Sequence, residues 1–234
     1  MREMERQLSR IIPEEKTPNE DRLVMLCDGV FAIAMTLLVL DIGSNIPQEL
    51  SASKVDGLLS NLVSPTISYL ITFLIIAMYW RGHRNLMRIV QRLDNGFISL
   101  TFLFLAFIVF FPVTSRLLGN HAENAHIIII YTLGLSGCSF SALALWLYAT
   151  WKHRLVSPAL SKTEIHTRTY TLLITPLIYC ASLLLLFVVP PDHPYYICFS
   201  WVLIGFIGKF VRSAYKRWLE KPVLALMHHE QEDN

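Results

Sequence analysis

The residue with the clearest chemical potential is Asp28, a carboxylate inside an apolar run, residues 22–42, that is long enough to cross a bilayer. Placing a charged side chain inside a membrane segment costs roughly a few kcal/mol. Such a group persists only when it is paired or used, so the sequence first predicts a partner or a function for Asp28.

Candidate partners for Asp28 lie at the end of the next apolar run. Trp80 and His83 are three residues apart, so they share one helix face, and both rings carry N–H donors suited to a carboxylate. We expect them to hold Asp28, with Asn95 at the start of the third run as a further candidate. The alternative is that Asp28 faces water and pairs with Arg22, about 9 Å away along the helix.

A second feature of the same segment is a stripe of aliphatic side chains with one hydroxyl. With Ile33 at zero and about 100° per residue, Thr36 falls near 300°, Leu37 near 40° and Leu40 near 340°. These four residues share one face, whereas Asp28 falls near 220°, on the other side of the helix. The stripe either lines a pore or, as aliphatic stripes in membrane helices often do, packs against another helix or lipid.

The elements that position these residues are long apolar segments. The 234 residues are 53% hydrophobic and 16% charged, against a charged fraction of roughly 25% in soluble domains. We predict an all-α polytopic membrane protein with six transmembrane helices per subunit. The domain limits are a tail at 1–21, a membrane domain at 22–216 and a tail at 217–234. The predicted spans are 22–42, 60–80, 95–118, 126–150, 168–190 and 195–216.

The orientation follows from the lysine and arginine residues between the spans. One side carries eighteen of them and the other side carries two, Lys54 and Arg116. The excess marks the cytosolic side, so both tails are expected there. The eighteen lie in residues 1–22, 81–92, 152–168 and 209–221.

Enzyme signatures are missing from the chain. It has no Gly-x-Ser-x-Gly, no His-Glu-x-x-His and no phosphate-binding glycine loop. The spacing of the four cysteines, Cys27 among them, does not resemble a metal site, and we interpret them as reduced packing residues. We therefore predict no catalytic residues, no metal, no cofactor and no nucleic-acid partner; the partners expected are lipid and further copies of the chain.

The first span resembles the signature helix of the transmembrane protein 175 family of potassium-permeable channels. The matching residues are Arg22-x-x-x-Leu26-Cys27-Asp28 followed by Gly-Val-Phe-Ala-Ile-Ala-Met-Thr-Leu-Leu-Val-Leu, and Trp80-x-x-His83 is also similar. One departure is visible, since the family has Phe-Ser where this chain has Leu26-Cys27. Cysteine is a weaker hydrogen-bonding group than serine, which bears on how firmly the motif supports the helix.

The resemblance implies a homotetramer in a prokaryotic plasma membrane, with the first helices around the pore. Ile33, Leu37 and Leu40 would then form the constrictions that gate it, and Thr36 would match a threonine implicated in potassium preference. Arg22, Cys27 and Asp28, together with Trp80, His83 and Asn95, would form the network that supports the pore helix.

The function expected is a potassium-permeable channel that passes K⁺ down its gradient. The alternative from another class is a proton-coupled secondary transporter that uses Asp28 and His83 as a relay, although such transporters usually show repeats that we do not find here. A structural or assembly factor without transport activity is the third possibility.

Overall fold

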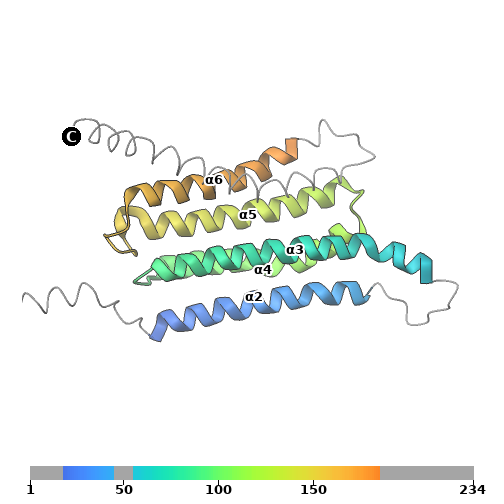
Figure 1. Cartoon of the computed structure of the whole chain (residues 1–234), viewed down its shortest axis with the longest axis horizontal. Coiled ribbons are helices and arrows are strands. Elements are labelled where there is room, and N and C mark those ends of the chain that lie inside the picture. The colour runs from blue at the N-terminus through green and yellow to red at the C-terminus, as the bar shows by residue number, and fades with distance from the viewer. Residues whose placement is uncertain (1–17, 45–54, 185–234) are drawn as a thin grey trace, which may run out of the picture.

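The computed structural model describes residues 18–44 and 55–184. The fold is all-α, and each of the first five predicted spans coincides with or overlaps one helix (Figure 1). The predicted sixth span, 195–216, and both predicted tails, apart from residues 18–21, lie outside the described residues. The elements are α2 (Pro18–Ser44), α3 (Val55–Ile89), α4 (Asn95–Asn120), α5 (Ala125–Thr150), the 3-10 turn η2 (Trp151–His153) and α6 (Lys162–Leu184).

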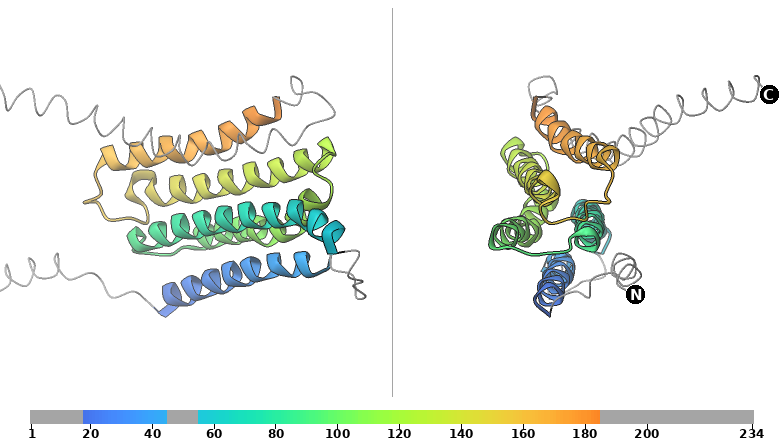
Figure 2. Two further views of the ribbon diagram at one scale, coloured as in Figure 1. Left: turned by 45° about the vertical axis from the view of Figure 1, so that its right-hand side comes forward. Right: turned by 90° about the vertical axis from the view of Figure 1, so that its left-hand side faces the viewer.

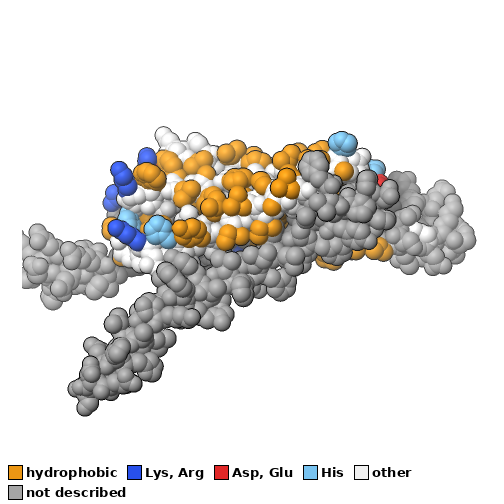
Figure 3. Space-filling model, turned by 90° about the horizontal axis from the view of Figure 1, so that it is seen from above, with side chains coloured by type: hydrophobic (Ala, Val, Ile, Leu, Met, Phe, Trp, Pro, Cys, Tyr) orange, Lys and Arg blue, Asp and Glu red, His pale blue; other side chains and the backbone are white. Residues whose placement is uncertain are grey.

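Four segments among the described helices are long and apolar enough to cross a membrane. They are Asp21–Leu40, Leu62–Ile89, Asn95–Asn120 and Ala125–His153. The space-filling view shows a broad apolar face with lysine and arginine side chains gathered at one end (Figure 3). This end carries the loops between α3 and α4 and between α5 and α6, and we call it the basic end. The apolar helices define an integral membrane protein.

The helices lie roughly side by side, with α2 at one edge of the bundle (Figures 1 and 2). Helix α2 packs against α3 and α4, α4 packs against α5, and α5 packs against α6. Because α2 has neighbours on one side, part of its circumference is left uncovered by the described residues. This arrangement is what makes its exposed face a candidate site.

Two helices extend further than the hydrophobicity of the sequence predicts. Helix α3 continues nine residues past Trp80 to Ile89, because Leu86 and Met87 add buried contacts there. Helix α6 begins at Lys162, six residues before the predicted start at 168. Its first turn is capped by the Ser161 hydroxyl, which accepts a hydrogen bond from the Glu164 amide at 3.1 Å. The added turns of α3 and α6 contain charged residues, so a prediction based on runs of apolar residues ends the one helix too early and begins the other too late.

Hydroxyl groups join α3, α4 and α5 in the half of the bundle away from the basic end. Ser68 Oγ donates to the Ser115 carbonyl at 2.8 Å, and Thr72 Oγ1 lies 3.0 Å from Ser115 Oγ and 2.8 Å from the Tyr131 hydroxyl. All four residues are buried, so these bonds satisfy polar groups that would otherwise be costly in hydrocarbon. They fix the three helices against one another.

The loops at the basic end are joined through Asp94. Its carboxylate accepts hydrogen bonds from the Phe97 amide at 2.8 Å and the Tyr148 hydroxyl at 3.0 Å, and Arg154 lies 2.9 Å away. Desolvation raises the pKa of Asp94, but these three partners outweigh it and hold the pKa below its ordinary value. These contacts join the α3–α4 and α5–α6 loops. A backbone hydrogen bond from the Gln91 amide to the Leu155 carbonyl joins the same two loops.

Candidate functional site

Helix α2 has one face that is buried against the bundle. The residues of this face recur every three or four positions, as a helix packed along one side requires. They meet α3 and α4, and aromatic contacts such as Phe31 with Phe104, ring centroids 5.9 Å apart, fix the helix against its neighbours. The buried residues are Leu23, Cys27, Phe31, Ala34 and Leu38.

The aliphatic stripe lies on the opposite face and is exposed. Ile33 is 61% exposed, Leu37 41% and Leu40 64%. Thr36 is also exposed, and its hydroxyl donates to the Ile33 carbonyl at 2.9 Å. No other helix of the described chain covers these side chains, so packing against another described helix does not account for them, and both a pore and contact with lipid stay open.

Asp28 is held by Trp80, as the sequence predicts. The indole Nε1 donates to Asp28 Oδ1 at 2.7 Å, a short bond of the kind expected for a charged acceptor. The Arg84 guanidinium lies over the Trp80 ring, 5.2 Å from its centroid. Within the described residues no ion pair joins Asp28 to Arg22, the alternative partner. The contact ties α2 to α3 near the basic end.

His83 does not make the hydrogen bond to Asp28 that the sequence predicts. Its ring is buried between α2 and α4, stacked on Phe104 at 5.5 Å and 6.3 Å from Phe31. Neither ring nitrogen has a hydrogen-bond partner in the described part of the chain. Three residues correspond to about 300° of helix rotation, which leaves His83 about 60° from Trp80 and turned towards α4. A position on the same helix face as Trp80 was therefore not sufficient to predict that His83 bonds to Asp28.

The remaining predicted network residues play separate parts. Cys27 is buried in the α2 face that packs on the bundle, whereas Arg22 is exposed. Asn95 is exposed at the first position of α4, and no hydrogen bond within the described structure links it to Asp28. Asp94, one residue earlier, is the residue that caps α4. Cys27, Cys138 and Cys180 are free thiols, and the described residues contain no cluster suited to a metal ion.

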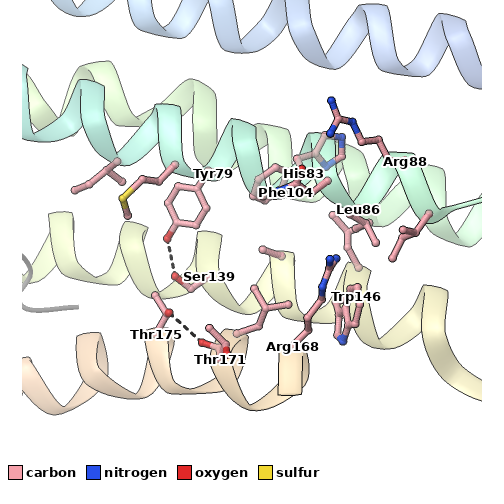
Figure 4. Close-up of a pocket in the computed structure, with 18 of the residues that line it drawn as sticks. Tyr79, His83, Leu86, Arg88, Phe104, Ser139, Trp146, Arg168, Thr171 and Thr175 are labelled. Carbon is pink, nitrogen blue, oxygen red and sulfur yellow. Dashed lines mark hydrogen bonds between the residues drawn. The ribbon is translucent and has the colours of Figure 1, made fainter. Parts of the chain in front are cut away.

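A cavity that sequence reasoning missed lies between α3, α5 and α6 (Figure 4). Its volume is about 530 Å³, and Tyr79, Trp146 and Arg168 are among the residues that line it. The one signal in the sequence is a row of threonines four residues apart, Thr167, Thr171 and Thr175, because this spacing places them on one face of α6.

The fold and the site together define an integral membrane protein built from long apolar helices, with one edge helix that exposes an aliphatic stripe. Comparison with known proteins then identifies the family. Residues 22–112 match the family described as the endosomal/lysosomal potassium channel TMEM175. A potassium channel of Chamaesiphon minutus is 31% identical over 177 residues, which cover 71% of this chain and 84% of that protein. The chain therefore belongs to the TMEM175 family.

Two further similarities agree with this assignment. A potassium channel of Streptomyces collinus is 28% identical over 141 residues, covering 58% of this chain and 68% of that protein. The crystal structure of a TMEM175 homologue from Chamaesiphon minutus, described as a lysosomal potassium-selective channel, superimposes with a TM-score of 0.64 at 22% identity. It covers 85% of this chain and 99% of the other, so the fold is shared over nearly the whole solved subunit.

Proposed function

We propose that this protein is a potassium-permeable channel whose pore is lined by α2 from several copies of the chain. The observation that carries the proposal is the exposure of Ile33, Leu37 and Leu40 on an edge helix whose opposite face is firmly packed. A pore built at the axis of an oligomer needs such a helix, exposed in the single subunit and covered only by the other copies. The named relatives, which are called potassium channels, support the same function.

Four copies of the chain, the number implied by the family resemblance, would place three aliphatic rings around the axis. A narrow apolar ring repels water, so an ion that passes must shed hydration, and the ring closes the pore when it is narrow. A small rotation or widening of α2 would admit a partly hydrated cation. Potassium would pass more readily than sodium because it releases water more easily, with the Thr36 oxygen as an additional ligand.

The contact between Asp28 and Trp80 would set the rotation of the pore helix. Asp28 lies about 130° around α2 from the centre of the stripe, so a tether there holds the stripe towards the axis without entering the pore. The buried Cys27 and Phe31 brace the same helix from behind. In this proposal Asp28 is a positioning residue, and the permeating ion does not bind it.

A proton-coupled transporter would need a relay between Asp28 and His83. The two residues share no hydrogen bond in the described structure, and neither ring nitrogen of His83 has a hydrogen-bond partner there. We therefore favour the channel. We further propose that the protein lies in a prokaryotic plasma membrane with its basic end towards the cytosol, in keeping with the positive-inside rule.

The test is potassium flux into liposomes that contain the purified protein, compared with sodium under the same gradient. We expect potassium flux well above that of empty liposomes. Ile33→Ser and Leu37→Ser should raise it by about tenfold or more, since a loss of about 1.4 kcal/mol from the barrier gives a factor of ten. Both side chains are exposed in the subunit, so the substitutions should leave each subunit folded.

The matched control is Leu74→Ser on α3, because Leu74 is 62% exposed, as Ile33 is at 61%. It should leave the flux unchanged. Flux that is equal in the wild type and in both α2 variants would refute the pore assignment. Saturable uptake that moves protons with the cation would instead favour the transporter.

A further inference from the structure

The cavity between α3, α5 and α6 has the size of a ligand site and lies away from the proposed pore. Its volume of about 530 Å³ falls in the range of about 300–1,000 Å³ that is usual for ligand pockets. Helix α2, which carries the stripe, does not contribute to its lining. A ligand in this cavity would therefore not contact the stripe on α2.

Most of the cavity wall is apolar or only weakly polar, apart from His83, Asn85 and the two arginines discussed below. Helices α3 and α5 contribute Ile75, Met78 and Leu145, among others. Helix α6 contributes hydroxyls, but these donate to its own backbone: Thr171 Oγ1 to the Thr167 carbonyl at 2.9 Å, and Thr175 Oγ1 to the Thr171 carbonyl at 3.3 Å. Because their donors are already used, the hydroxyls tolerate a hydrocarbon neighbour.

The end of the cavity nearer the basic loops carries positive charge. Figure 4 shows the Arg168 side chain rising from α6 towards α3 beside Trp146, and its guanidinium lies 5.3 Å from the ring centroid. Arg168 also pairs with Glu164 at 3.2 Å, but both side chains are partly exposed and a guanidinium has five N–H donors, so it can still bind an anion. Arg88 belongs to the α3 wall, although its side chain points away from α6 in Figure 4.

The length of the cavity matches one leaflet of a bilayer. Along α3 its lining runs from Ile75 to Ile89, about 21 Å at a rise of about 1.5 Å per residue. Half of a bilayer about 40–45 Å thick, headgroup regions included, is about 20–22 Å. An amphiphile with its head at Arg168 would thus reach the middle of the membrane with its tail, near Tyr79 and Tyr179.

We propose that this cavity binds an anionic phospholipid from the leaflet at the basic end. One acyl chain lies between α3, α5 and α6, and the phosphate binds the Arg168 guanidinium. Such a lipid joins α6 to α3 in each subunit, and this site does not depend on the channel activity of the protein.

The experiment measures lipid retention by the delipidated full-length protein in detergent. The protein is incubated with equal amounts of phosphatidylglycerol and phosphatidylcholine, repurified and examined by native mass spectrometry. The wild type should retain phosphatidylglycerol in preference, by about fivefold for one arginine near an anionic headgroup. Arg168→Gln should abolish the preference, and Arg168→Lys should keep part of it.

Two further variants separate the site from nonspecific binding. Arg92→Gln removes an exposed charge outside the cavity and should leave the preference intact. Ala142→Phe fills the cavity from α5 and should reduce retention of both lipids, while circular dichroism reports whether the helices persist.

Equal retention of the two lipids by the wild type would overturn the proposal, as would an equal effect of Arg92→Gln and Arg168→Gln. Absence of retained lipid in the wild type would also overturn it. Potassium flux measured on the same samples tests the channel separately, so the two proposals can fail independently.

Discussion

Replacing Trp80 by phenylalanine should loosen α2 from α3 without removing the aromatic packing. The indole Nε1 donates to Asp28 Oδ1 at 2.7 Å, and phenylalanine lacks this donor. The phenyl ring still fills much of the same space and can still lie beneath Arg84, which is 5.2 Å from the Trp80 ring centroid. The substitution therefore acts mainly on one hydrogen bond.

The expected size of the effect follows from the type and the setting of the bond. Hydrogen bonds to charged groups contribute about 1.5–3 kcal/mol in soluble proteins, whereas side-chain bonds measured in a membrane protein average about 0.6 and reach about 1.7 kcal/mol. Asp28 is exposed in the subunit, which favours the lower range. We expect the Trp80–Asp28 pair to contribute about 1 kcal/mol, which changes the ratio of folded to unfolded protein roughly fivefold.

A double-mutant cycle of Trp80→Phe and Asp28→Ala measures this value from reversible unfolding in mixed micelles. Asp28→Ala alone is not interpretable, because it also removes a carboxylate that is costly within a membrane segment, but the cycle cancels this contribution. Trp151→Phe is the control: Trp151 is 68% exposed, and its ring donates no hydrogen bond within the described residues. Additivity of the two changes within about 0.3 kcal/mol would refute the proposed tether.

Two further predictions concern the close approach of α4 to α3 at Gly119 and the loop contacts of Asp94. Gly119→Ala should destabilise the fold by about 1–3 kcal/mol, because its Cβ would lie 2.9 Å from the Pro65 Cα, a backbone atom that cannot simply turn away. Gly29→Ala is the matched control, with nothing within 4 Å, and should be neutral or slightly stabilising; equal losses in the two variants would contradict the packing argument. Because the folded-state pKa of Asp94 lies below its ordinary value of 3.8, its contribution to stability should be present above about pH 4 and be lost as the pH falls through the lower folded-state pKa. Unfolding of the wild type and of Asp94→Asn measured between about pH 6 and pH 3 should converge at low pH, and a constant difference would speak against the link to Arg154.

Much of the fold and part of the site follow from local pattern. A run of about 20 apolar residues must form a helix in a bilayer, because backbone groups have no other partners there, so the first five helices were predicted, and four of them are long and apolar enough to cross a membrane. A helix turns by about 100° per residue, so the stripe of Ile33, Leu37 and Leu40 separates from the buried face on geometry alone. The contact of Asp28 with Trp80 was predicted because a membrane carboxylate needs a donor and few were available.

The tertiary structure decided which neighbour meets each helix face. His83 is enclosed by Phe31 and Phe104, although its position on α3 also allowed a bond to Asp28, because a rotation of about 60° was enough to turn it towards α4. The bonds from Asp94 to Tyr148 and Arg154 join residues more than fifty positions apart, and no local period encodes them. The cavity between α3, α5 and α6 likewise exists only where three helices fail to fill the space between them. Sequence periodicity fixes the direction of a side chain about its own helix axis, whereas contacts and voids depend on how several helices pack together.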